Sequence, residues 1–398
     1  MPELWSRYTL TAELLSDAHL GSGSGGGGID ALVARDRRGR PVIWASHVEG
    51  VLRDAARRLH GDQAAQNFFG RAGGDYARSD RQRAVFTSLY TTDSIESHVW
   101  RSTACEAFNN RAPKDDTLRV VEYVPRGTKL VGEVELPASE HPVLLRLVQE
   151  VDSLGGGRST GAGRVKLSLT EVNAAPRTVG APTGHLLLLL RNRDPLCITA
   201  TATPDNLIPS LSFVPGRTLL GAVAAWLIAE GDRDSASLLT SGRVAVSDAL
   251  PLAHAPTTLE SVEVLPAPLS LQSQKAKGSA GEAPWWAQAK TPTRRLDAWN
   301  ADANENEKLK RPEDDLFVYR AAADHPWTTF RPARRVRLRN GRPDPTQAHA
   351  SLFAIEQIVE ETHFLAELQG VLGDMKKLAE RLAPILEGRR WLRLGRGG

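Results

Sequence analysis

The stretch Leu154-Gly155-Gly156-Gly157-Arg158-Ser159-Thr160-Gly161-Ala162-Gly163-Arg164-Val165 decides how the rest of the chain is interpreted. An amphipathic run precedes it and the alternating residues 165–169 follow it, which predicts a helix, a glycine loop and a strand in that order. Glycine allows backbone N–H groups to approach a ligand closely, and the two arginines place positive charge at the ends of the loop. We therefore predict a phosphate-binding loop, with a flexible turn as the alternative.

The composition is that of an ordinary globular protein. The chain has 398 residues, 41% hydrophobic and 24% charged, so it is long enough for two domains with full cores. Lysine and arginine total 50 against 47 aspartate and glutamate, so a polyanion site must be local. The two cysteines lie far apart, which argues against a disulfide framework or a zinc cluster and favours a reducing cytoplasm. No apolar run approaches the roughly 20 residues of a membrane span, and we expect no membrane partner.

The N-terminal part contains a second glycine-rich segment, residues 21–30, which ends on Asp30. It holds a formal GxGxxG, but strand patterns follow it at 31–33 and 42–44, whereas a dinucleotide site requires a helix there. No Gly-Lys-Ser/Thr is present, so a P-loop is also excluded. The neutral description is a flexible loop that ends on a carboxylate.

A strand at residues 41–44 leads directly into a helix. Apolar residues from Val48 to Leu59 follow helical spacing, so we predict that the helix starts near Ser46, which is a natural N-cap. The free N–H groups of a helix N-terminus bind anions, and Gly50 would let a ligand pack against the first turn.

The chain carries an internal duplication. Residues 213–224 repeat 42–53 at an offset of 171, which places Gly221 on Gly50, and residues 335–367 align with 101–133 at an offset of 234. A broken copy of the glycine loop, Leu394-Gly395-Arg396-Gly397-Gly398, ends the chain at an offset of 240. Because the alignment offset between the two copies grows from 171 to 234 residues, the second copy contains an insertion of about 63 residues. Its visible part, residues 272–312, is predicted to be a long loop.

Each copy reads as strand, turn, strand, helix, hairpin region, strand, helix and glycine loop, which is the βαββαβ order of a ferredoxin-like (RRM-like) unit. We therefore predict an α+β protein with two tandem units, residues 1–175 and 176–398, and inserted hairpins. In the second hairpin region, 330–356, Asn340-Gly341 predicts a two-residue turn beside alternating arginines. Such a basic hairpin suits RNA binding, or else forms a solvated edge that discourages strand pairing. The second unit lacks a final strand, so its C-terminal edge is expected to be incomplete.

Four motifs together resemble the RAMP (repeat-associated mysterious protein) superfamily of CRISPR systems. They are the Gly-Ile-Asp end of segment 21–30, the Val-Pro-Gly-x-x-Leu-x-Gly motif at 214–221, the Glu-x-Val-x-x-Gly-Thr strand at 122–128, and the glycine loop at 154–163. The resemblance spans nearly the whole chain except the insertion. It is strongest to the two-unit subunit of type III-D effector complexes, and the first unit also resembles the guide-RNA backbone subunit of type III complexes.

The resemblance implies a cytoplasmic subunit that coats CRISPR guide RNA within a type III effector ribonucleoprotein, alongside target RNA and other subunits. In backbone subunits an aspartate at the position of Asp30 cuts bound target RNA. A carboxylate beside a phosphodiester can help to activate the 2′-OH, directly or by holding a divalent cation such as Mg²⁺ or Mn²⁺, and no tightly bound cofactor is expected. A purely structural Asp30 that orients its loop remains the equal alternative.

The resemblance and the local patterns together give one set of expected RNA-binding residues. They are Ser46, Gly50, Arg53, Arg101, Gly156, Gly157, Arg158, Ser159, Gly161, Gly163, Arg164, Gly216, Arg217, Gly221, Arg335, Arg337 and Arg396. The family pattern is broken where Trp44-Ala45 replaces Pro-Gly and where Glu49 and Leu220 replace lysine. These departures weaken the expected phosphate contact at the two helix N-termini.

Two rival functions stay open at this point. A guide-processing endoribonuclease of the same superfamily would need a histidine base, for which His19, His47 and His98 are the candidates, although satisfied polar contacts explain them as well. A general single-strand RNA binder would need stacking aromatic residues on a basic sheet. The nine Phe and five Tyr lie mostly inside apolar runs, which disfavours that function.

Overall fold

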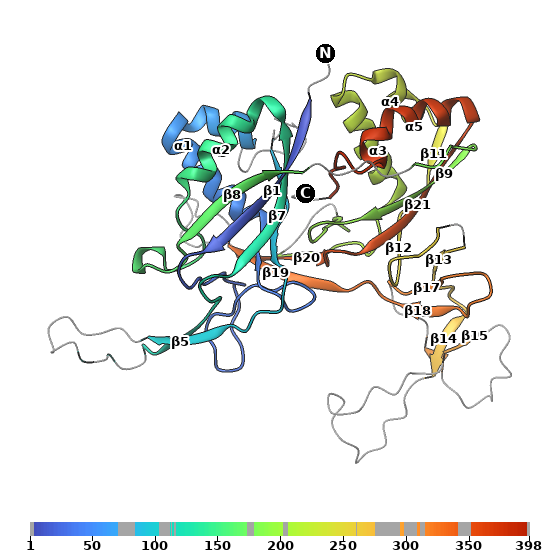
Figure 1. The fold of residues 1–398 in the computed structure, drawn as a ribbon. Helices are drawn as coiled ribbons and strands as arrows, with labels where there is room; N and C mark the ends of the chain where they lie inside the picture. Colours follow the sequence, from blue (N-terminus) through green and yellow to red (C-terminus); the bar gives the residue numbers. More distant parts are fainter. Residues whose placement is uncertain are drawn as a thin grey trace.

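The computed structural model describes residues 4–70, 84–102, 112, 114, 117–172, 179–201, 206–259, 261–274, 295–297, 309–310, 315–340 and 352–395. These residues form mixed α+β structure with several antiparallel sheets (Figure 1). The predicted α+β class is therefore confirmed. None of the helices in this part of the chain is both long and apolar enough to span a membrane.

The first large sheet is built around β1 (Trp5–Leu14). Its order is β2-β4-β7-β1-β8, with β3 also paired to β7, and all its pairs are antiparallel. The other strands are β2 (Val42–Ile43), β3 (Val85–Phe86), β4 (Leu89–Thr91), β7 (Lys129–Pro137) and β8 (Val165–Glu171). Helices α1 (Ala45–Phe69) and α2 (His141–Glu150) cover one face of this sheet (Figure 1).

The core of this half follows from the residue alternation. Leu10, Ala12 and Leu14 of β1 point inward and are fully buried, as the alternating pattern predicts. Helix α2 buries Leu144 and Leu147 at a spacing of three against the same core. The two short 3-10 turns beside α2 are η1 (Ala138–Glu140) and η2 (Arg158–Thr160).

The second large sheet is centred on β21 (His363–Gly370). Strand β9 (His185–Arg191) pairs along one edge of β21, and β11 (Val244–Val246) and β12 (Leu250–Pro251) pair along the other. Helices α3 (Gly216–Ala229), α4 (Arg233–Thr240) and α5 (Leu372–Leu386) pack on this sheet. Among the described residues no further strand pairs with β9.

Smaller hairpins and sheets project from the two halves. Strand β5 (His98–Ser102) pairs with β6 (Arg119–Tyr123), and β10 (Leu207–Ile208), β20 (Leu352–Ile358) and β19 (Arg334–Asn340) form another sheet. Strands β13 (Glu263–Pro266), β17 (Phe317–Arg320) and β18 (Thr328–Phe330) form a third. The short strands β14 (Leu271–Gln274), β15 (Arg295–Asp297) and β16 (Leu309–Lys310) form a fourth. Most of the predicted insertion, 272–312, lies outside the described residues.

The two halves repeat the same hydrogen bonds at the offset of 234. Glu122 and Glu356 each accept an N–H from the loop before a helix, Thr128 and Thr362 each donate to the carbonyl three residues earlier, and Glu133 and Glu367 each donate an N–H to a hydroxyl. The duplication found in the sequence therefore recurs as equivalent local structure.

One local prediction is corrected. Helix α1 begins at Ala45, near Ser46 as predicted, but Ser46 is not its N-cap: Trp44 holds that position, and the hydroxyl of Ser88 on a neighbouring segment accepts the Ala45 N–H. The predicted two-residue turn at Asn340-Gly341 extends outside the described residues, and Asn340 itself pairs with Leu352 within the β19–β20 ladder. The connection between these strands lies outside the described residues.

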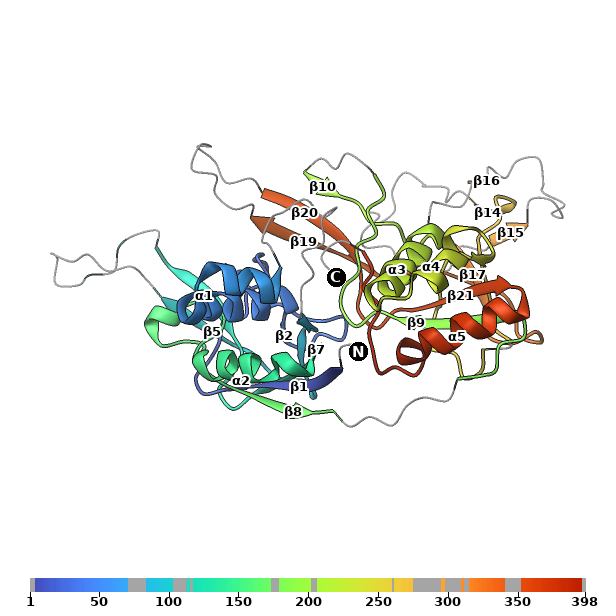
Figure 2. The same cartoon turned by 90° about the horizontal axis from the view of Figure 1, so that it is seen from above.

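Ion pairs join the two halves. Arg390, after α5, forms an ion pair of 2.8 Å with buried Glu135 of β7, and its guanidinium lies 4.0 Å from the Trp5 ring centroid. The carboxylate of Asp194, after β9, accepts the Ser88 N–H at 3.0 Å. Strands β19 and β20 extend from the second half toward the first (Figure 2).

Candidate functional site

The glycine loop of residues 154–164 is a tightly held structure rather than a flexible turn. The Gly156 N–H donates to the carbonyl of His19 at 2.9 Å, and the Gly163 N–H donates to the carbonyl of Asp17 at 2.7 Å. Gly155, Gly157, Gly161 and Gly163 all have positive φ, which is why glycine is required there.

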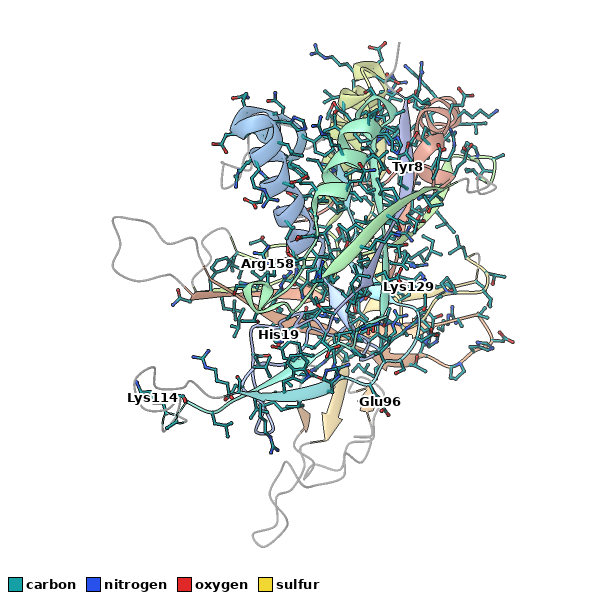
Figure 3. All side chains as sticks on the ribbon, turned by 60° about the vertical axis from the view of Figure 1, so that its left-hand side comes forward. Tyr8, His19, Glu96, Lys114, Lys129 and Arg158 are labelled. Carbon is teal, nitrogen blue, oxygen red and sulfur yellow. The ribbon has the colours of Figure 1, made fainter. Side chains whose placement is uncertain are left out.

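One part of the loop presents unpaired backbone donors. Gly157 is left-handed and is followed by the 3-10 turn η2, a pairing of conformations that forms an anion-binding nest. Within the described part of the chain, the N–H groups of Gly157, Arg158 and Ser159 have no hydrogen-bond partner. Arg158 is exposed on the same loop (Figure 3). We refer to residues 157–159 as the nest.

Histidine 47 anchors the nest to helix α1. The Gly155 N–H donates to Nε2 of His47 at 3.0 Å, which requires a neutral imidazole. Burial lowers the pKa of His47, and the charges of Arg158 and then Arg337 lower it further. Both guanidinium groups therefore act on the same imidazole, although they come from different halves of the chain.

The second half contributes Arg337 from β19. Its guanidinium lies 5.0 Å from the Trp44 ring centroid, and its Nη2 lies 3.4 Å from the Ser46 hydroxyl in the first turn of α1. The nest, Ser46, His47 and Arg337 thus form one basic surface at the N-terminal end of α1. We call this set of residues the basic surface.

The lowered pKa of His47 gives a prediction about pH. The unfolded chain binds the imidazole proton more tightly than the folded one, so stability is complete above the ordinary value of 6.5 and is lost as pH falls below it. We expect the midpoint of urea unfolding to fall between about pH 7.5 and about pH 5, and to fall less for His47→Gln, which keeps an acceptor but does not titrate. Equal losses in the two proteins would show that His47 does not couple to folding.

Comparison with known proteins places the first half in a family. The family model described as the RAMP superfamily matches residues 11–166. Residues 11–166 belong to the RAMP superfamily. Among curated proteins none matches the chain. We call residues 11–166 the RAMP domain.

Solved structures give weaker similarities. A chain of the type III-B Cmr-beta complex bound to cognate target RNA is 16% identical, with a TM-score of 0.34, over 43% of this chain and 62% of that one. Oligomeric Cmr4 from Pyrococcus furiosus is 13% identical, with a TM-score of 0.28, over 42% of this chain and 99% of that one. A type IV-B CRISPR complex chain is 16% identical, with a TM-score of 0.28, over 44% and 95%. These scores are too low to carry an argument about function.

Two arginines expected to bind RNA have structural partners instead. In the RAMP domain, Arg53 pairs with Glu49 at 2.6 Å and donates to the carbonyls of Phe69 and Gly70, which ties down the end of α1. Arg335 is 18% exposed and pairs with buried Glu360 at 2.8 Å, while also donating to a carbonyl of the RAMP domain. Their positive charges are already used within the protein.

The helix N-terminus of the second half differs from that of the RAMP domain. The Gly216 N–H donates to the carboxylate of Asp248 at 2.6 Å, whereas the corresponding donor in α1 meets the neutral hydroxyl of Ser88. A carboxylate at this end occupies the place that an anion would take. This finding argues against phosphate binding at Gly216 and the neighbouring Arg217.

The remaining expected residues are dispersed. Gly50 and Gly221 are exposed glycines with open space around them, and Arg101 is exposed on β5. Ser159, Gly161 and Arg164 are exposed on the glycine loop of the RAMP domain, in or beside the nest. Arg396 lies outside the described residues.

Asp30 of the RAMP domain is exposed but has a structural contact. Its Oδ2 accepts the Val120 N–H at 2.7 Å, and its own N–H donates to the Val120 carbonyl at 2.8 Å. Its Oδ1 has no contact within the described part of the chain. Asp30 therefore orients the loop against β6 and still presents one carboxylate oxygen to solvent.

The surroundings of Asp30 supply little for a metal ion. Within the residues that the structure describes, no group of three or more His, Cys, Asp or Glu side chains is arranged to hold a metal ion. Mg²⁺ usually binds through one or two carboxylates together with substrate phosphates and water. An ion at Asp30 would fit this pattern only if RNA phosphates supplied further oxygen ligands.

The other candidate histidines of the RAMP domain have polar partners. Nδ1 of His19 donates to the carbonyl of Glu122 at 2.8 Å, and Nε2 of His98 donates to the carboxylate of Asp17 at 2.8 Å. These are the satisfied contacts that the simpler interpretation predicted. The stacking of Trp44 against Arg337 was not predicted, because nothing in the sequence relates residues so far apart.

Proposed function

We propose that the protein is an RNA-binding subunit of a type III CRISPR effector ribonucleoprotein that holds guide RNA by its phosphates. The observation that carries the proposal is the basic surface, where unpaired N–H groups of the nest meet Arg158 and Arg337. N–H groups and guanidinium groups contact phosphates without reading bases. The RAMP match and the sequence motifs support the CRISPR assignment, and the type III-D subunit is the subtype we favour.

The proposal includes two tandem ferredoxin-like units, residues 1–175 and 176–398. In the first, the antiparallel order β4-β7-β1-β8 with two helices on one face supports such a unit. In the second, β9 pairs with one edge of β21, and β11 and β12 pair with the other edge, as β8 and β7 flank β1 in the first. The hydrogen bonds of Glu356, Thr362 and Glu367 also repeat those of the first unit. Under this proposal the subunit works in the cytoplasm with guide RNA, target RNA and other effector subunits.

A second candidate activity is cleavage of target RNA at Asp30. The supporting observation is that Asp30 is exposed and has one unbonded carboxylate oxygen. A lone carboxylate without a histidine partner is a weak base at neutral pH, so cleavage would require Mg²⁺ or Mn²⁺. Without this activity the protein is a structural guide-binding subunit.

The phosphate contact is tested by removing the two arginines of the basic surface. We expect Arg158→Ala with Arg337→Ala to weaken binding of single-stranded RNA roughly 10-fold at about 0.1 M salt. The salt slope of the binding constant should fall by about 1.4, or about 0.7 for each phosphate that the variant no longer neutralises. Fluorescence anisotropy between about 50 mM and about 200 mM salt measures both quantities.

The matched control removes two arginines that are exposed elsewhere. Arg146 on α2 and Arg233 on α4 are exposed and lie outside the basic surface. Their double alanine variant should bind RNA as the unchanged protein does, apart from a small effect of net charge. If both double variants lose affinity equally, or if unchanged protein binds equally at low and high salt, the proposed function is wrong.

A further inference from the structure

The hairpin of β5 and β6 carries a stack of aromatic rings. The rings of Trp100 and Tyr123 have centroids 4.6 Å apart with an angle of 30° between their planes. The ring of His98 lies 5.9 Å from that of Trp100 at a similar angle. His98 is opposite Tyr123 in the ladder, so the alternation of the strands places all three rings on one face.

The stack is only partly covered by protein. Trp100 is 47% exposed, although tryptophan is a residue that a folded protein usually buries for the most part. Tyr123 packs against Trp100, and the ring of His19 also lies beside Tyr123. His98 is fixed by its hydrogen bond to Asp17. The protein therefore holds Trp100 in one orientation and leaves a large part of its surface to solvent.

The stack adjoins the nest. The Tyr123 hydroxyl lies 3.9 Å from the point where a β-carbon on Gly157 would stand. Trp100 is one ring further along the same stack. The Tyr123 side chain therefore extends from the nest to the Trp100 ring.

We propose that the open surface of Trp100 stacks one unpaired base of a single-stranded RNA whose adjoining phosphate lies on the nest. The inference rests on the proposed RNA-binding function and adds a base-stacking position to it. Stacking on an aromatic ring accepts any base, because every base has a π-face. The position would therefore add affinity without reading sequence.

Charge favours RNA over an apolar protein segment as the occupant. The exposed charged side chains of β5 and β6 are Arg101 and Arg119, and the carboxylate of these strands, Glu122, is buried. Lys114 lies further out on the same hairpin (Figure 3). Arg119 pairs with Ser102, two residues after Trp100, and so lies on the same face of the hairpin as Trp100, whereas Arg101 lies on the opposite face. An aromatic ring with a neighbouring arginine is complementary to a base and its phosphates.

The test compares two RNA probes of equal length, one of mixed sequence and one with abasic ribose throughout. Unchanged full-length protein should bind the mixed RNA roughly 10-fold more tightly than the abasic RNA, and Trp100→Ala should remove most of that preference. Trp100→Phe should keep part of it. Trp327→Ala, which removes another exposed tryptophan from the turn between β17 and β18, should have no effect on it.

The outcomes separate this inference from the proposed function. If the unchanged protein binds neither RNA in a salt-dependent way, the proposed function itself fails. If it binds both but Trp100→Ala and Trp327→Ala retain the same preference for bases, only the stacking position is wrong. Photo-crosslinking of 4-thiouridine RNA to Trp100, mapped by mass spectrometry, gives an independent result on unchanged protein, and crosslinks confined to other segments would overturn the inference.

Discussion

Replacing Gly163 with alanine is expected to destabilise the RAMP domain by about 4 kcal/mol or more, enough to prevent folding in many domains. A β-carbon at this position would overlap the carbonyl oxygen of Leu154, and that oxygen cannot easily move aside because Leu154 is itself fully buried. The residue also has a φ of +72°, which disfavours any side chain. Urea unfolding followed by circular dichroism measures the change.

Gly161 provides the matched control for this substitution. Its φ is +88°, but a β-carbon there would have open space around it. Gly161→Ala should therefore cost only about 1 kcal/mol, from backbone strain alone. If the two variants unfold at the same urea concentration, the close approach of residues 154 and 163 is not what holds the loop.

Asp30→Ala is expected to abolish one cleavage position in target RNA, if the subunit cuts RNA, while guide binding is retained. The loss of the hydrogen bond to Val120 should lower stability by only about 1 kcal/mol. The measurement is a denaturing gel of end-labelled target RNA with the assembled complex, with and without Mg²⁺ or Mn²⁺.

Asp30→Asn separates the catalytic role from the structural one. An asparagine oxygen can still accept the Val120 N–H, but the side chain carries no charge. If Asp30 is the catalytic carboxylate, the Asp30→Ala and Asp30→Asn complexes both lose the cleavage position. If the Asp30→Asn complex, or each of the two variant complexes, still cuts at every position, cleavage belongs to other subunits and this chain has a structural role.

The sequence was most informative where a pattern is local. The alternation of β1, the spacing of apolar residues in α2 and the glycine loop all follow from short-range sterics and burial, and the structure has them at the predicted places. The duplication was also readable, because each copy must keep the same buried contacts.

The sequence was least informative about which charges the protein uses for its own packing. Arg53 and Arg335 look in the sequence like arginines available to RNA, yet Arg53 holds the end of α1 and Arg335 is paired with buried Glu360. Only packing between distant segments decides which guanidinium is used internally. The cap of α1 is a similar case, since Ser88 of another segment accepts the Ala45 N–H, and Ser46 lies two residues after the N-cap position, Trp44.

The exposed tryptophan of β5 was missed for a different reason. Phe and Tyr lie mostly inside apolar runs of the sequence, which indicated that stacking residues are scarce. Trp100 lies in β5, where Val99 and Trp100 are adjacent apolar residues and every residue from Val99 to Ser102 is exposed, so no alternating pattern marked a solvent-facing side. Trp100 is exposed because the β5–β6 hairpin projects away from the core, and the sequence alone does not show that projection.

The basic surface draws on residues from early and late in the order of translation. Ser46, His47 and the nest are synthesised in the first half of the chain, whereas Arg337 belongs to a strand made late. A nascent chain that has folded only the RAMP domain thus lacks one of the two arginines near His47. Under the proposed function, capture of RNA by the complete set of contacts would therefore occur late, only after both halves have been synthesised and have folded against each other.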